Sequence, residues 1–75
     1  MKIKVLTFGA LTEVLNKEFD MEAIDTESLL ALLIAKHSAL AGRSLLIAVN
    51  NVVVNSNVSL KENDVVALMP PYSGG

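Results

Sequence analysis

Residues 25–42 read DTESLLALLIAKHSALAG and form the longest helix pattern of the chain. Asp25 and Thr26 can accept hydrogen bonds from the free N–H groups of a first helical turn, and Gly42 suits the left-handed residue after a last one. The stretch therefore predicts one main helix near Glu27–Leu40. Its apolar face consists of Leu29, Leu30, Leu33, Ile34 and Leu40.

Two strand patterns precede this helix. Lys2–Phe8 and Lys17–Glu22 both alternate with a period of two, and Ala10–Asn16 between them predicts a short helix with one apolar stripe. The second strand carries carboxylates on one face. That stripe could meet a basic partner, but we favour a solvated face whose charges block edge-to-edge pairing.

Three strand patterns follow the helix. Leu45–Val49 and Val52–Val54 flank Asn50-Asn51, a dipeptide that tolerates the positive φ of a hairpin turn. Val65–Met69 is apolar on both faces, as in a central or covered strand. One main helix cannot cover both faces of the sheet, so the pattern predicts two layers. The expected fold class is α+β, a β-grasp with a mixed sheet of about five strands.

Length and composition exclude several classes of protein. A chain of 75 residues has room for one domain, and 52% hydrophobic residues exclude intrinsic disorder. The sequence has no Cys, which excludes disulfides and thiolate chemistry and makes the cytoplasm the expected location. A net charge of −2 without a basic stripe argues against nucleic acid as a partner. The longest apolar run, Leu29–Ala35, is too short for a membrane span.

The chain lacks the side chains of a self-sufficient active site. His37 is the only histidine and falls beside the apolar helix face, where we expect a structural role. There is no glycine-rich phosphate loop and no cluster with metal-ligand spacing. We therefore expect no enzyme activity from this chain on its own, no metal and no bound cofactor.

The sequence ends in an unusual segment, Pro70-Pro71-Tyr72-Ser73-Gly74-Gly75. Two prolines end a sheet ladder, and two glycines leave no side chain to obstruct a narrow channel. We expect a β-grasp domain over residues 1–69 and an extended tail over residues 70–75. The terminal carboxylate is anionic at neutral pH and resists nucleophiles until ATP converts it to an acyl adenylate. On the Gly-Gly dipeptide alone, a frayed end is the simpler interpretation.

The residues around the dipeptide reverse that preference. Leu60-Lys61-Glu62-Asn63-Asp64, the strand Val65–Met69 and the Pro-Pro and Gly-Gly pairs together resemble the small, sulfur-carrying subunit of molybdopterin synthase. This family is ubiquitin-like and related to the thiamin sulfur carrier. Further matches are Val5-Leu6-Thr7-Phe8-Gly9, Leu11, Glu13 and Ala48-Val49-Asn50. The family often has Gly where Asn63 stands, and no Arg follows Leu11 in the predicted first helix.

The resemblance implies a carrier function in molybdenum cofactor biosynthesis. A ubiquitin-activating-type enzyme would use ATP to adenylate Gly75, and sulfur would then replace one carboxylate oxygen. Gly74 and Ser73 would form the slender approach into a pocket of the large subunit, where the thiocarboxylate donates sulfur to a cyclic pterin precursor. The implied assembly is a heterotetramer in which this chain is the non-catalytic donor.

The resembled fold also implies a docking surface, because its first and last strands lie side by side in parallel. We expect the large subunit to contact Phe8, Leu68, Pro70, Pro71 and Tyr72, while the pattern leaves open which sheet face is outward. A covered patch that completes the core is the alternative. Alternative functions are sulfur delivery for thiamin or tRNA thiolation, modification of lysines in the manner of ubiquitin, and an interaction domain with an inert tail.

Overall fold

The computed structural model describes residues 1–42 and 45–70. Five strands, one α-helix and two 3-10 helices form in these ranges, in the order β1 (Lys2–Thr7), η1 (Gly9–Glu13), β2 (Glu18–Glu22), α1 (Thr26–Lys36), η2 (Ser38–Leu40), β3 (Leu46–Val49), β4 (Val52–Val54) and β5 (Val65–Met69). All five predicted strands are present, with ends that differ from the prediction by one residue at most.

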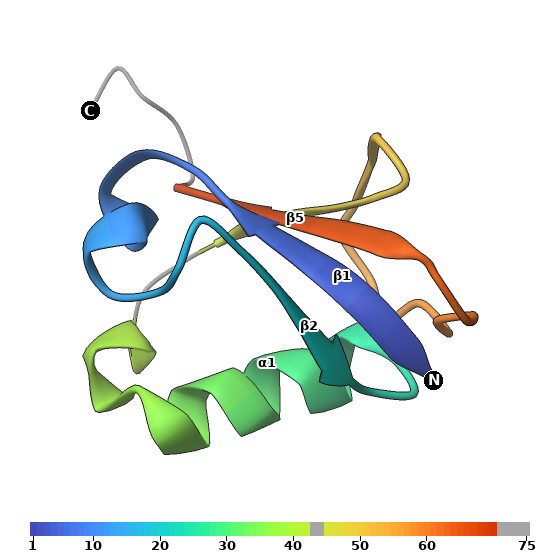
Figure 1. Cartoon of the computed structure of the whole chain (residues 1–75), viewed down its shortest axis with the longest axis horizontal. Coiled ribbons are helices and arrows are strands. Elements are labelled where there is room, and N and C mark those ends of the chain that lie inside the picture. Colours follow the sequence, from blue (N-terminus) through green and yellow to red (C-terminus); the bar gives the residue numbers. More distant parts are fainter. Residues whose placement is uncertain (43–44, 71–75) are drawn as a thin grey trace.

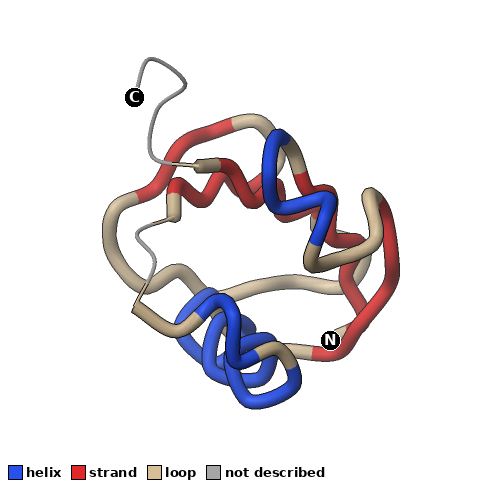
Figure 2. Tube along the Cα trace, turned by 90° about the vertical axis from the view of Figure 1, so that its left-hand side faces the viewer, coloured by secondary structure: helices blue, strands red, loops and turns tan. Residues whose placement is uncertain are grey.

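The strands form one mixed sheet in the order β2-β1-β5-β3-β4. β1 and β5 run parallel, with Val5 opposite Val66, and all other neighbours are antiparallel. α1 lies across one face of this sheet (Figure 1). From the side, the strands curve around one part of the molecule and α1 lies opposite them (Figure 2). The predicted α+β β-grasp architecture is therefore confirmed.

The core lies between α1 and the sheet face that carries Ile3, Val5, Val66 and Leu68. Leu29 and Leu33 of the helix are buried against it, as are leucines from η1, η2 and the connector before β5, namely Leu11, Leu40 and Leu60. Thr7 is the one polar residue of β1 on this face. Its hydroxyl donates to the Asn16 carbonyl at 2.8 Å, so its burial leaves no unpaired oxygen.

The main helix begins at Thr26, one residue before the predicted start, and ends earlier than predicted. The Asp25 carboxylate accepts a hydrogen bond from the Ser28 N–H at 2.8 Å and caps the first turn. The predicted end at Leu40 is wrong, because the helix stops at Lys36 and His37 leaves helical geometry with ψ of 86°. A separate 3-10 turn then brings Leu40 into the core, where it is 1% exposed.

The other local predictions concern turns. The short helix predicted over Ala10–Asn16 is a 3-10 helix that begins at Gly9 and ends at Glu13. Asn50 and Asn51 both have positive φ, 50° and 71°, which confirms the hairpin turn between β3 and β4. Asn63 has a φ of 70°, so asparagine does supply the left-handed residue of the turn before β5.

Candidate functional site at the end of the sheet

The last strand is held on both sides at the centre of the sheet. β5 pairs with β1 on one side and β3 on the other, and the chain leaves it after Met69. Because β1 and β5 are parallel, this exit lies at the same end of the sheet as the end of β1 (Figure 1). The Phe8 N–H donates to the Leu68 carbonyl at 3.2 Å and extends the pairing to the exit.

Gly9 and Pro70 meet at this exit. A Cβ placed on Gly9 would lie 2.9 Å from Cγ of Pro70, and Gly9 has a φ of +63°. Only glycine fits both the left-handed backbone and the close approach without strain. Gly9 is not among the site residues predicted from the sequence, although a glycine between a strand and a short helix is a signal for such a turn.

The sheet face opposite α1 carries apolar side chains beside the exit. They come from β1 and the residue that follows it, and from β3 and β5, and we call them the apolar sheet patch: Leu6, Phe8, Leu46, Ala67 and Met69. The register places Leu6 beside Ala67 and Leu46 beside Met69. Phe8 is 47% exposed and Leu46 is 38% exposed. The sequence does not decide which face of the first and last strands points away from the helix. The structure shows that it is the face with Leu6, Phe8, Ala67 and Met69.

The placement of Leu68 corrects one predicted docking residue. Leu68 is 0% exposed and belongs to the core, on the same face as Thr7 and Ile47. Its side chain therefore cannot form part of the surface of the folded chain. Alternation gives the outward position to Met69, which is half-buried.

The remaining predicted site residues differ in whether they can be placed. Pro70 is half-buried at the exit beside Gly9, and Phe8 is exposed there. Five residues lie outside the described ranges, namely Pro71, Tyr72, Ser73, Gly74 and Gly75. The structure thus brings Phe8 and Pro70 to one place, while the domain boundary at residue 70 and the roles of the last residues stay predictions.

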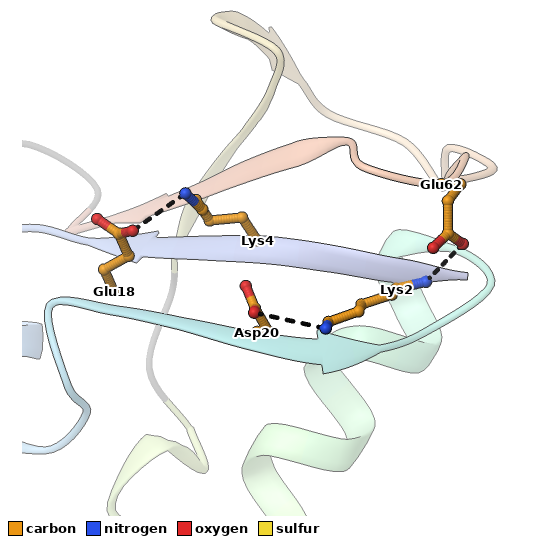
Figure 3. A network of polar contacts seen from close by, with 5 residues as sticks. All are labelled: Lys2, Lys4, Glu18, Asp20 and Glu62. Carbon is orange, nitrogen blue, oxygen red and sulfur yellow. Dashed lines mark hydrogen bonds and ion pairs between the residues drawn. The ribbon is translucent and has the colours of Figure 1, made fainter.

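The other half of the outward face is charged. Lys4 forms an ion pair with Glu18 at 3.1 Å and Lys2 with Asp20 at 3.9 Å, across the β1–β2 pair. The Glu62 carboxylate accepts a hydrogen bond from the Lys2 backbone N–H at 3.0 Å (Figure 3). These groups are solvent-exposed, so each pair contributes little to stability. They divide the face into a charged half on β2 and the first part of β1, and an apolar half at the exit.

An open hollow of about 510 Å³ lies where these halves meet. Leu6 and Phe8 form its apolar wall, and Glu18 lies at its charged side. It is continuous with the apolar sheet patch because both share Leu6 and Phe8. A partner that covers the patch would reach this hollow as well.

A pair of polar side chains fixes the start of β5. Asn50 donates from Nδ2 to Oδ1 of Asp64 at 3.0 Å and accepts from the Val65 N–H at 3.0 Å. The Lys61 N–H donates to the other Asp64 oxygen at 2.8 Å. The hydrogen bonds from Asn50 and from the Lys61 backbone hold the pKa of Asp64 below its ordinary value of 3.8.

The structure also places His37 and the acidic side chains, for which the sequence predicts no catalytic role. His37 is half-buried at the end of α1 and lines a hollow of about 230 Å³ together with Lys36 and Asp20. Within residues 1–42 and 45–70, no three His, Asp or Glu side chains gather as a metal site would require. No helix in those ranges is long and apolar enough to cross a bilayer.

Comparison with known proteins supplies the family. The model of the ThiS family matches residues 5–75. The molybdopterin synthase sulfur carrier subunit of Chlamydomonas reinhardtii is 40% identical across the full length of both chains. A chain in the Helicobacter pylori complex of subunits 1 and 2 of molybdopterin-converting factor is 29% identical, with complete coverage of both chains and a TM-score of 0.76. The small archaeal modifier protein 1 of Methanosarcina acetivorans covers 99% of this chain and 96% of its own, with a TM-score of 0.82 and 23% identity, and shows the fold alone.

Proposed function

The chain belongs to the ThiS family, and from that premise we propose that it is the sulfur carrier subunit of a molybdopterin synthase. It carries sulfur on its own C-terminus and leaves the catalytic side chains to its partner. The relatives that support this are the sulfur carrier subunit of Chlamydomonas reinhardtii and the two-subunit complex of Helicobacter pylori.

The carrier chemistry uses the carboxylate of Gly75. That carboxylate, with a reference pKa of about 3.3–3.7, is a poor electrophile at neutral pH. A ubiquitin-activating-type enzyme transfers AMP to it from ATP and releases pyrophosphate. A sulfide-level donor then attacks the acyl carbon, AMP leaves, and a thiocarboxylate remains. The sequence contains no Cys, so the terminus is the place where this chain can hold reactive sulfur.

The thiocarboxylate then passes its sulfur to a cyclic pterin precursor in the large subunit. Attack of sulfur on the precursor, followed by hydrolysis of the acyl–sulfur bond, returns the Gly75 carboxylate for another cycle. Gly74 and Ser73 are the slender approach that enters the partner's pocket. No cofactor needs to be bound by this chain, since ATP is consumed by the adenylating enzyme.

The observation that carries the proposal is the position of β5. It is the middle strand of five and is paired on both sides along its length. A tail that follows such a strand starts from a rigid point, and Pro70 packed against Gly9 defines that point. A carrier needs this arrangement, because its reactive end must enter another protein's pocket while its fold stays intact.

The apolar sheet patch is the surface that docks the large subunit. It lies directly beside the exit, it includes the exposed Phe8 and Leu46, and the charged pairs of β1 and β2 border it on one side. Burial of such a patch by a partner removes apolar area from water and brings the tail to the partner in one orientation. Pro71 and Tyr72 are expected to extend the contact along the tail.

A pyrophosphate-exchange assay tests the activation step. The full chain, a ubiquitin-activating-type adenylating enzyme, ATP and labelled pyrophosphate are mixed, and label incorporated into ATP is counted. Exchange that depends on this chain and disappears when Gly75 is deleted supports the proposal. Exchange that persists without Gly75 contradicts it. A chain found linked through Gly75 to lysines of other proteins would instead identify a modifier.

A further inference from the structure

The two edge strands of the sheet differ in how they are protected against pairing with a strand of another molecule. β2 is one edge, and it carries three exposed carboxylates, those of Glu18, Asp20 and Glu22. β4 is the other edge and consists of three valines. The sequence contains no charged residue and no proline from residue 44 to residue 60, a range that includes all of β3 and β4. Charge and proline are the usual means of blocking an open edge, and β4 has neither.

The side chains of β4 are also unusually exposed for valine. Val52 is 63% exposed and Val53 is 59% exposed. Val53 pairs with Ala48 and therefore lies on the face opposite α1, whereas Val52 pairs with Val49 and lies on the helix side. An exposed strand of β-branched residues has strong β-propensity but buries little on its own.

Within residues 1–42 and 45–70, the backbone of Val53 has no partner on its outer side and can pair outward. In a hairpin with a two-residue turn, the residues that flank the turn, here Val49 and Val52, form a hydrogen-bonded pair. The next pair, Ala48 and Val53, is then non-hydrogen-bonded. The N–H and C=O of Val53 consequently point away from β3, into the space beyond the edge.

We propose that β4 is a self-association edge, at which two copies of this chain pair their β4 strands in antiparallel fashion around a two-fold axis at Val53. That symmetry places the outward N–H of each Val53 opposite the outward C=O of the other, so both hydrogen bonds form. It also sets valine opposite valine, which is a favourable cross-strand pair. The two five-stranded sheets become one continuous sheet.

A second copy is the occupant that the symmetry of the β4 edge favours, because identical strands pair there without opposing charges. Each copy carries a net charge of −2, so association through most of the surface is opposed by repulsion. The edge of β4 holds no charge that could oppose it. The same operation at the β2 edge would bring Glu18, Asp20 and Glu22 against identical carboxylates, so that edge is closed to self-pairing.

The pairing is weak and leaves the carrier machinery free. A strand of three residues buries far less than the roughly 1,200 Å² of a stable interface, so we expect association only at high protein concentration. β3 separates β4 from β5, and edge pairing lies in the plane of the sheet rather than over the apolar sheet patch. The inference therefore does not rest on the proposed function.

The test is sedimentation velocity on the isolated full chain from micromolar to millimolar concentration. We expect the average mass to rise with concentration for the wild type and for an Ile24→Lys control, which places a charge at an apolar position that is 67% exposed and outside the sheet. Val53→Lys and Val53→Glu should each stay monomeric. An equimolar mixture of the two should associate, because the opposing charges then attract.

Two results would overturn the proposal: a wild type that stays monomeric to millimolar concentration, or a mixture of the Lys and Glu variants that does not associate. Hydrogen exchange on the wild type alone tests the pairing even if the variants fail to fold. Hydrogen exchange at the Val53 amide should slow as protein concentration rises, while an unchanged rate at all concentrations would contradict the pairing.

Discussion

Gly9 and Pro70 are in contact where the chain leaves the sheet, although 61 positions separate them in sequence. The contact joins the end of β1 to the first residue after β5. It leaves no room for a Cβ on Gly9, since Cγ of Pro70 would lie only 2.9 Å away. The proline ring is bonded to the backbone at both ends, so moving it moves the start of the tail.

The first prediction concerns this contact. Gly9→Ala should lose about 1–2 kcal/mol of stability through its left-handed backbone and should also displace Pro70. Gly42→Ala is the matched control, because Gly42 has a φ of +81° and nothing within 4 Å of its Cβ position. Because Gly9→Ala adds the contact with Pro70 to the same backbone strain, we expect its urea midpoint at or below that of Gly42→Ala, and slower adenylation for Gly9→Ala alone. Equal adenylation rates would show that the contact does not guide the tail.

The second prediction is that a substitution on the outward face of the sheet weakens binding to the large subunit without unfolding the chain. Phe8→Glu should stay folded and bind the large subunit roughly tenfold more weakly or worse, because a charge at a buried contact costs more than about 1 kcal/mol. Ile24→Glu, at an exposed apolar position away from the patch, should bind normally. Calorimetric titration and circular dichroism measure both properties. Normal binding by Phe8→Glu would place the docking surface elsewhere.

Leu68 provides the opposite control. Its side chain is fully buried, so Leu68→Ala should lower the free energy of unfolding by about 2–5 kcal/mol. Leu68→Glu should fail to fold, since the core offers no partner for the charge. A stable, folded Leu68→Glu chain would contradict the assignment of the two faces.

The third prediction is a loss of stability in acid. Asp64 has a pKa below 3.8 in the folded chain because Asn50 and the Lys61 N–H bind its charged form, and Asp25 has a lowered pKa because of Ser28 and Asn57. The unfolded chain therefore takes up protons first as the pH falls. The stability that these two carboxylates contribute is fully present above their ordinary pKa of 3.8. It is lost as the pH falls through their lower pKa values in the folded chain.

The variant Asp64→Asn tests whether the charged carboxylate of Asp64 stabilises the fold in this direction of pH. The amide offers one oxygen where the carboxylate offers two, so the variant should be less stable at neutral pH. Its urea midpoint should then fall less steeply in acid, and the two proteins should converge below the ordinary Asp pKa of 3.8. A difference in urea midpoint between the two proteins that widens in acid would contradict this explanation.

Much of the fold could be predicted because local signals agree with one another. The alternation of Lys2–Phe8, the Asn50-Asn51 turn and the Asp25 cap each specify an element without reference to the rest of the chain. The early end of α1 could not be found in this way. His37 continues the helical pattern of the sequence, yet α1 ends at Lys36 and a separate 3-10 turn carries Leu40 into the core.

The candidate site was predictable only in part for a similar reason. Val65–Met69 is apolar on both faces, so the sequence alone does not distinguish the buried Leu68 from the outward Met69. That distinction depends on which face α1 covers, which is a property of the assembled sheet. The contact of Gly9 with Pro70 is also a long-range consequence of the parallel pairing of β1 with β5.

The fourth prediction concerns the last two residues. Deletion of Gly75 should abolish sulfur transfer and leave the unfolding midpoint unchanged, because a chain terminus contributes little to packing. Gly74→Ala should keep the fold and slow adenylation, since one methyl group obstructs close backbone approach. Unfolding curves and single-turnover adenylation measure the two effects. Full transfer activity without Gly75 would be incompatible with a carrier role.

The mass of the intact protein purified from its own cells tests most directly whether Gly75 carries sulfur. We expect a species heavier than the sequence by the difference between one sulfur and one oxygen atom. Fragmentation should locate that difference in the C-terminal residue, and a strain that lacks the adenylating enzyme should lose it. An ordinary carboxylate in every molecule from both strains would contradict the claim.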